Sequence, residues 1–173
     1  MTASSSSRRS TTPPHRSLVC VVPIIDTATG LLVRPDQGPI AQWRPLHTST
    51  RPKESTSTAA SRLVTEKFGL ALLPEDFAIS GHLKLRHADV PSSIWLTVFV
   101  ARNVPRSTSI RGHQTDWVSP TTMPEIMDEG DRIWLREVLL GHMVTGWITH
   151  TMMGKLADFS LKIKPRQRLL DRP

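Results

Sequence analysis

The sequence predicts one domain, either of the α+β class or a mixed α/β/α sandwich. Three observations lead to this prediction. The chain has 173 residues, about the length of one ordinary domain. Short apolar runs of strand type occur both before and after an amphipathic segment at residues 55–68. A second helical pattern near residues 131–140 supplies the other helical layer.

The first half of the domain is predicted to be a hairpin followed by a helix. Residues 17–25 form a nearly continuous apolar run, which is typical of a strand covered on both faces. The turn-forming residues 26–30 then lead into a second short strand at 31–34. In 55–68, apolar residues recur every three or four positions, and Gly69 follows the last of them, so we expect a helix with a glycine stop.

The second half is predicted to be an antiparallel set of strands, a helix and a final strand. Residues 82–86 alternate between polar and apolar, 94–100 are apolar, and 115–118 give a short third strand. The helix at 131–140 has Asp131 as a candidate N-cap. The last strand is expected at 144–148.

The net charge of +7 lies at the two ends of the chain. Residues 1–25 carry +3 and residues 155–173 carry +4, so the body is formally neutral and does not resemble a basic DNA clamp. We expect a disordered basic tail at 1–16, a domain at 17–154, and a basic C-terminal tail at 155–173 that is helical near 156–161. Either tail could contact RNA by charge.

Composition excludes several classes of protein. Aromatic residues make up 5% and Tyr is absent, so a sheet that stacks RNA bases on rows of Tyr and Phe is not expected. The single Cys20 excludes a disulfide within the chain or a cysteine-built zinc site, and we expect it in the core. The apolar runs are shorter than a membrane span, which needs roughly 20 residues. We therefore expect an intracellular protein, cytoplasmic by default, although the acid-free, Arg-containing start also suits a mitochondrial address.

Residues 48–70, TSTRPKESTSTAASRLVTEKFGL, resemble the Nudix box, G-x5-E-x7-R-E-U-x-E-E-x-G-U, where U is apolar. Six of the nine fixed or class positions fit, and three differ. The differing positions are Thr48 in place of Gly, Leu63 in place of Glu and Lys67 in place of Glu. The matching positions are Glu54, Arg62, Val64, Glu66, Gly69 and Leu70.

The flanking sequence resembles the MutT-type Nudix enzymes that hydrolyse oxidised purine nucleoside triphosphates. Trp43 stands eleven residues before Glu54, as a Trp does in those enzymes. An Asp-Trp pair at 116–117, a Trp-containing helix at 131–140 and a Gly-Trp pair at 146–147 follow in the order that the family shows. The resemblance implies a Nudix-like α/β/α sandwich with a mixed sheet, in which the box forms a loop-helix-loop.

The resemblance also implies a metal site that this sequence has degraded. Positions 63, 66 and 67 are neighbours on a helix, and the family fills them with carboxylates for Mg²⁺. Here they are Leu63, Glu66 and Lys67, so only Glu66 remains as a metal ligand, and we expect no cofactor. In the alternative, a surviving Mg²⁺-dependent pyrophosphohydrolase, Glu66 and Glu54 would be the catalytic residues.

Four other residues are candidates for binding a nucleotide. Arg44, His47 and Lys67 would offer positive charge to phosphates, and Asp131 would accept hydrogen bonds from a base. In the purine-specific relatives an Asn stands where Arg44 is found and an Asp where Gly130 is found, so their specificity does not carry over. We expect a non-catalytic protein that binds a nucleoside phosphate, an RNA end or a protein partner.

Overall fold

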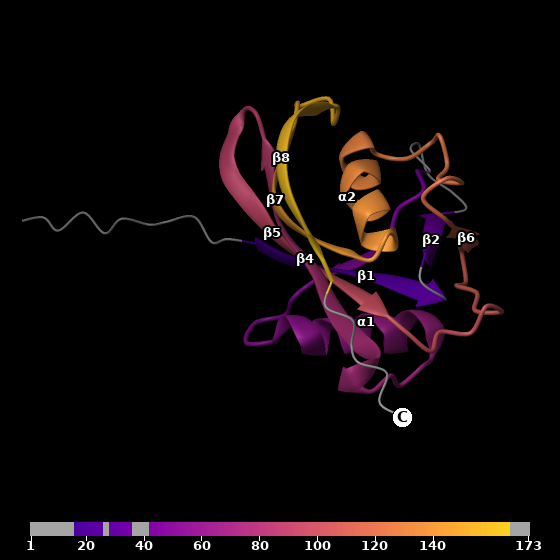
Figure 1. Ribbon diagram of the computed structural model, residues 1–173. Coiled ribbons are helices and arrows are strands. Elements are labelled where there is room, and N and C mark those ends of the chain that lie inside the picture. The colour runs from indigo at the N-terminus through magenta and orange to yellow at the C-terminus, as the bar shows by residue number, and fades with distance from the viewer. Residues whose placement is uncertain (1–15, 26–27, 36–41, 167–173) are drawn as a thin grey trace, which may run out of the picture.

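The computed structural model describes residues 16–25, 28–35 and 42–166. Figure 1 shows two α-helices on opposite faces of a twisted sheet. The elements in chain order are β1 (Arg16–Ile25), β2 (Thr29–Pro35), β3 (Leu46–Ser49), α1 (Thr56–Phe68), a 3-10 turn (Pro74–Asp76), β4 (Phe77–His87), β5 (Val90–Ala101), β6 (His113–Val118), α2 (Glu129–Leu139), β7 (His142–His150) and β8 (Leu156–Pro165).

The sheet is mixed, as the sequence predicts. Its strand order is β6-β2-β1-β5-β4-β7-β8, and β3 also pairs with β1. β1 runs parallel to β5 and β4 runs parallel to β7, whereas the remaining pairs are antiparallel. β1 and β2 form the predicted hairpin, but β2 then leaves β1 and pairs with β6. The third predicted strand of the antiparallel set, β6, therefore does not join β4 and β5.

Each face of the sheet has its own hydrophobic core. The first core, against α2, contains Cys20, Val22, Val98 and Trp134 among other residues, and the second, against α1, contains Val19 and Val21. Alternate residues of β1 thus enter different cores, because side chains alternate across a strand. This explains the nearly continuous apolar run of 17–25 and confirms that Cys20 is buried.

Helix α1 has the predicted ends. The Ser55 hydroxyl accepts a hydrogen bond from the Thr58 amide at 3.1 Å, which is an N-cap. Gly69 adopts a left-handed conformation at φ 68°, and its amide donates to the Thr65 carbonyl at 2.9 Å. A residue with a Cβ is disfavoured there, so the glycine stop of the sequence pattern is a real C-cap.

Helix α2 begins earlier than predicted, and Asp131 is not its N-cap. The cap is Asp128, whose carboxylate accepts a hydrogen bond from the Asp131 amide at 3.0 Å. Asp131 instead lies in the first turn, where its own carboxylate accepts a hydrogen bond from the Trp134 indole at 3.0 Å. The side chain of Asp131 is therefore available to line a pocket.

The predicted C-terminal tail is wrong for residues 156–165, which form strand β8 and not a helix or a tail. β8 pairs with β7 along its length. Leu161 and Ile163 alternate with Lys162 and Lys164, so the segment has the period of a strand that the basic composition obscured. The predicted tail at 1–16 lies outside the described residues except for Arg16, which begins β1, and residues 167–173 also lie outside them. Among the described helices, none has the length and hydropathy to cross a bilayer.

Candidate functional site

A hub of ion pairs around Arg62 holds the loop before α1. The Arg62 guanidinium donates to both carboxylate oxygens of Glu54, at 2.7 and 2.9 Å, and to the Ser49 carbonyl of β3 at 3.0 Å. The Arg51 amide donates to Glu54 at 2.7 Å. The hydrogen bonds from Arg62 and then from Arg51 lower the pKa of Glu54 to about 2. Glu54 is thus the main partner of Arg62, and its hydrogen bonds connect the loop before α1 to the helix.

Glu66 is also engaged by arginine. Its carboxylate accepts a hydrogen bond from Arg51 at 3.1 Å and lies 3.5 Å from Arg62, which is the expected i,i+4 pair. Its side chain is about half exposed. Leu63 is buried in the core against α1, so the expected cluster of positions 63, 66 and 67 reduces to Glu66 and Lys67.

The carboxylates of the box helix and the loop before it do not fit the coordination of a magnesium ion. Mg²⁺ requires several oxygen ligands in nearly octahedral geometry. The two box carboxylates, Glu54 and Glu66, are each hydrogen-bonded to guanidinium groups, and Lys67 follows Glu66 directly. Within the described residues, no group of three or more His, Cys, Asp or Glu side chains is placed to hold a metal ion.

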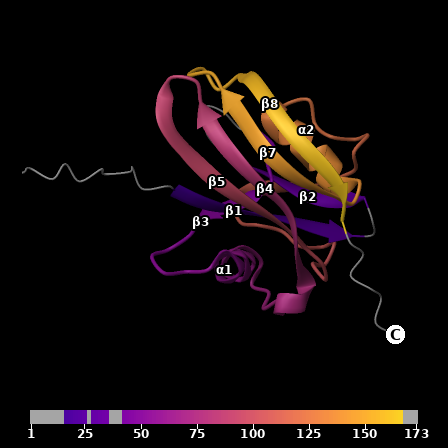
Figure 2. The same ribbon diagram turned by 60° about the vertical axis from the view of Figure 1, so that its left-hand side comes forward.

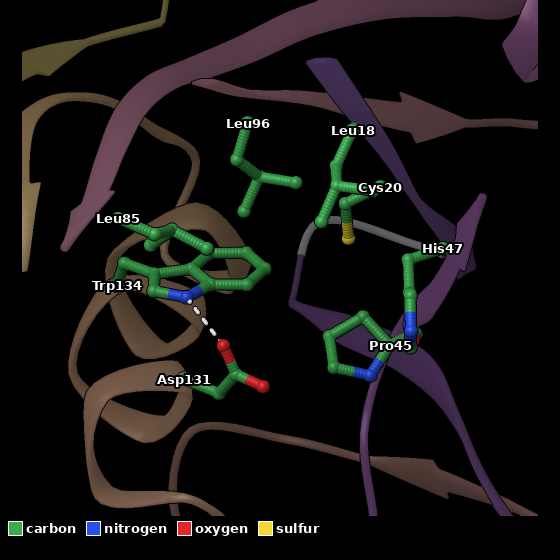
Figure 3. A pocket seen from close by; sticks show the side chains of 8 residues that line it. All are labelled: Leu18, Cys20, Pro45, His47, Leu85, Leu96, Asp131 and Trp134. Carbon is green, nitrogen blue, oxygen red and sulfur yellow. Dashed lines mark hydrogen bonds between the residues drawn. The ribbon is translucent and has the colours of Figure 1, made fainter. Parts of the chain in front are cut away.

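A pocket of about 140 Å³ lies between the sheet and α2. Figure 3 shows Asp131 and Trp134 of α2 on one side of the pocket. On the other side lie Cys20 of β1, His47 of β3 and Pro45, which precedes β3. The remaining wall is apolar and consists of Leu18, Leu85 and Leu96. The pocket is therefore mostly apolar, with two titratable polar groups, one on each side.

Asp131 is the buried acid of this pocket. One of its carboxylate oxygens accepts the Trp134 indole hydrogen bond, and the other points into the pocket (Figure 3). Burial raises the pKa of Asp131 to about 6, although the hydrogen bond from Trp134 opposes the rise. The carboxyl group can therefore donate a hydrogen bond below about pH 6 and acts as an acceptor only above that pH.

Of the three predicted cationic residues, His47 lines the pocket, and Arg44 and Lys67 act on it through their charges. Burial lowers the pKa of His47, with Arg44 and Lys67 lowering it further by repulsion. Arg44 also acts on Asp131 by attraction. Arg44 thus acts on both polar titratable side chains of the pocket, and Lys67 acts on His47.

The space beside Asp131 explains why position 130 is Gly. A Cβ on Gly130 would lie 2.8 Å from the His150 ring and 3.0 Å from the Asp128 carboxylate. His150 in turn lies 3.1 Å from Asp128. A side chain at position 130 would therefore displace His150 or Asp128.

Asp128, Arg51 and the apolar wall of the pocket were not found from the sequence. An Asp three residues before Asp131 is an N-cap signal that could have placed the helix start. Arg51 has no such signal, because it meets Glu66 only through the fold of the loop. The wall residues Leu85 and Leu96 lie on the neighbouring strands β4 and β5. From the sequence, an apolar residue in such a strand is interpreted as part of the core.

Solved structures with a similar fold include several MutT and Nudix proteins. A MutT protein from Bacillus halodurans aligns with a TM-score of 0.71 at 17% identity, covering 85% of this chain and 97% of its own. A MutT Nudix hydrolase from Burkholderia pseudomallei aligns at 0.58 and 18% identity, covering 71% and 97%. The E. coli dihydroneopterin triphosphate pyrophosphohydrolase aligns at 0.57 and 15% identity, covering 73% and 97%.

No protein-family model and no curated protein matches the sequence. At these identities the structural likeness establishes the fold. The mixed sheet, the two helices on opposite faces and the box helix α1 are arranged as in those structures. The chain has the Nudix fold in its MutT-like form.

Proposed function

We propose that this Nudix-fold protein binds a nucleoside phosphate in the pocket beside α2, without a metal ion and without cleaving it efficiently. One observation carries the proposal. Asp131 and His47 line the pocket, the charges of Arg44 and Lys67 act on His47, and arginines hold both box carboxylates. These features support binding of a ligand in the pocket by residues other than the box carboxylates.

The pocket suits a base and not a whole nucleotide. Its volume of about 140 Å³ is below the roughly 300–1,000 Å³ of sites that bury a complete drug-sized ligand. A planar ring can lie between Leu85, Leu96 and Trp134, and Asp131 can hydrogen-bond to its edge. The sugar and phosphates would then extend out of the pocket.

The phosphates would be bound by side chains at the rim. Arg44 and Lys67 carry permanent positive charge, and Arg can bind a phosphate through two parallel hydrogen bonds. His47, with its lowered pKa, would serve as a hydrogen-bonding group more than as a charge. Lys67 stands where the family has a metal-binding Glu, so a fixed cation would replace the charge that Mg²⁺ supplies in active relatives.

Titration calorimetry with nucleoside mono-, di- and triphosphates tests this proposal, in EDTA and again in Mg²⁺. We expect binding in EDTA that Mg²⁺ does not strengthen. Asp131→Asn and Lys67→Gln should each weaken it by about tenfold to 150-fold, since a hydrogen bond to a charged group is worth about 1.5–3 kcal/mol. Lys155→Gln, on the exposed turn before β8, is the matched control and should change nothing.

The alternative hydrolase gives a different result. Release of phosphate or pyrophosphate that requires Mg²⁺ and is abolished by Glu66→Gln would contradict the binding proposal. Absence of any nucleotide binding, with the fold intact by circular dichroism, would contradict both.

A further inference from the structure

The sheet face opposite the pocket carries two tryptophans, Trp95 exposed and Trp147 half-buried, together with cations. Lys84 pairs in register with Trp95 of β5 and with Trp147 of β7, and Trp147 pairs with Ser160 of β8. Residues that pair across a sheet share a face, so these four form one row. Their sequence neighbours Leu85 and Leu96 line the pocket on the other face. The row is therefore on the far side of the sheet from the proposed nucleotide site.

Helix α1 covers only part of this face. It packs against β1, β3 and the end of β5 that holds Phe99 and Ala101. In Figure 2, α1 lies below β1 and β3, while β7 and β8 rise away from it. Trp95 remains 44% exposed, and Arg86, Lys162 and Lys164 are exposed as well.

The aromatic rings and the positive charges on this face are in direct contact. The Lys84 ammonium lies 5.5 Å from the ring centre of Trp95, and the Arg86 guanidinium lies 5.5 Å from that of Trp147. Such contacts hold an indole in place and keep a cation beside it. Bases stack on indole rings and on guanidinium planes, and phosphates bind the neighbouring cations.

The face is hollowed at the end where β4 turns into β5. A pocket of about 410 Å³ is lined there by Lys84, Arg86, Ser93 and Thr149, together with the turn residues. Serine and threonine hydroxyls thus lie among the cations. A hydroxyl can both donate to and accept from the 2′-hydroxyl of a ribose.

The charge of the face is positive. Lys162 and Lys164 of β8 pair with Thr145 and Met143 of β7, which lie on the same face as Trp147. β8 therefore adds two cations to Lys84 and Arg86 on this face. The acid that the pairing places on this face is Asp158, opposite Thr149. Four cations against Asp158 and the turn residue Asp89 leave a net positive charge, which favours a polyanion as the partner.

We propose that this face, defined by Trp95, Lys84, Trp147, Arg86, Lys162 and Lys164, binds single-stranded RNA. Bases stack on the tryptophans, the four cations bind phosphates, and the hydroxyls of the hollow contact ribose. The proposal is independent of the pocket beside α2. The proposed face also differs from an RNA-binding sheet that stacks bases on rows of Tyr and Phe. Its aromatic residues are two tryptophans, 52 positions apart in sequence, that the fold brings beside cations.

Fluorescence anisotropy of a labelled single-stranded RNA of about 12 nucleotides, a length within the range of known single-strand sites, tests the proposal on the full chain. With four phosphate contacts, log K should fall against log salt with a slope of about −2.8, or about 50-fold between 50 and 200 mM salt. Lys162→Gln with Lys164→Gln should reduce the slope by about 1.4. Trp95→Ala should weaken binding by about 5- to 150-fold and leave the slope unchanged.

A matched double variant, Arg111→Gln with Arg136→Gln, removes the same charge from exposed positions away from this face and should leave the salt slope unchanged. Asp131→Asn should also leave RNA binding unchanged, so failure of the nucleotide proposal does not affect this one. Circular dichroism checks that each variant folds, and the lysine double variant alone decides the matter if Trp95→Ala does not fold.

Three results would overturn the proposal. One is no RNA binding at 50 mM salt. Another is a salt slope that the lysine double variant does not change, which would mean that Lys162 and Lys164 only protect an edge strand from pairing with other chains. The third is single-stranded DNA binding as tightly as RNA. Sedimentation in which wild type is a dimer and Trp95→Ala a monomer, without RNA binding, would assign the face to a second copy of this chain.

Discussion

The replacement of Asp131 by Asn gives the sharpest test of the pocket, because it removes a charge and preserves a hydrogen bond. The Asn side-chain oxygen can still accept the Trp134 indole N–H. Burial raises the pKa of Asp131 from its ordinary 3.8 to about 6. A difference of about two pKa units between the folded and unfolded states corresponds to about 3 kcal/mol.

The sign of the pH dependence follows from which state holds the proton. Between pH 3.8 and about 6 the folded protein keeps Asp131 protonated, whereas the unfolded chain has lost that proton. The folded state then binds more protons, so stability falls as pH rises through this window. Above pH 6 the wild type bears the whole cost of a buried carboxylate, and Asp131→Asn does not.

We therefore expect Asp131→Asn to match wild type near pH 3.5 and to exceed it at pH 7.5. The gain of about 3 kcal/mol is an upper value and corresponds to a rise in melting temperature of about 6–12 °C for a chain of this size. Thermal melts at several pH values between 3.5 and 8 measure it. The difference between the two proteins is the quantity to follow, because it cancels groups that are common to both.

Other groups near Asp131 titrate and require a control. Asp128, His150 and Arg44 act on it through their charges, and His47 faces it across the pocket. The lowered pKa of His47 makes stability rise as pH increases toward 6.5, which opposes the effect of Asp131. His47→Gln with and without Asp131→Asn separates the two. Parallel stability curves for wild type and Asp131→Asn between pH 4 and 6 would refute a buried proton on Asp131.

Three further predictions concern the box loop, β8 and the pocket rim. Arg62→Ala should lower the melting temperature and flatten the loss of stability between pH 4.5 and 2, because Glu54 stabilises the fold only while its pKa stays low; an unchanged acid limb in pH-dependent melts would contradict this. Gly146→Ala should destabilise far more than Gly141→Ala in urea titrations. Both glycines have positive φ, but only at Gly146 would a Cβ meet the Ser160 carbonyl, at 1.9 Å, so equal losses would argue against β8. Lys67→Gln should raise the pKa of His47 in an NMR titration, and no change would place Lys67 away from the pocket.

The sequence predicts most of the fold because its strongest patterns are local. The run at 17–25 has one apolar face for each core, and the helix at 56–68 has its own cap and stop, so neither depends on distant contacts. β8 was missed because its lysines resemble a solvated tail, although Phe159, Leu161 and Ile163 recur with the period of a strand. Pairing with β7 supplies hydrogen bonds that its composition does not show.

The candidate site is less accessible to prediction from sequence, since its residues come together only through the topology. The resemblance to the Nudix box points to Arg44, His47, Lys67 and Asp131. In the structure His47 and Asp131 line one pocket, and the charges of Arg44 and Lys67 act on the pKa of His47. The lowered pKa of His47 and the raised pKa of Asp131 follow from desolvation in the fold, which the sequence does not show. Arg51 was also beyond reach, since a flexible side chain in a loop has no pattern.

The two altered positions of the box helix have different physical meanings. Leu63 is buried in the core against α1, so a Glu there would carry a charge into an apolar environment and would have to shift outward or remain protonated. Lys67 is exposed, and a Glu there would cost little. In the present loop, Arg51 and Arg62 supply the positive charge that neutralises Glu54 and Glu66. Reversal of Lys67 alone would therefore add a carboxylate without releasing the other two, and a metal site would require the arginine contacts to open first. In this structure the box carboxylates therefore form ion pairs that hold the loop before α1.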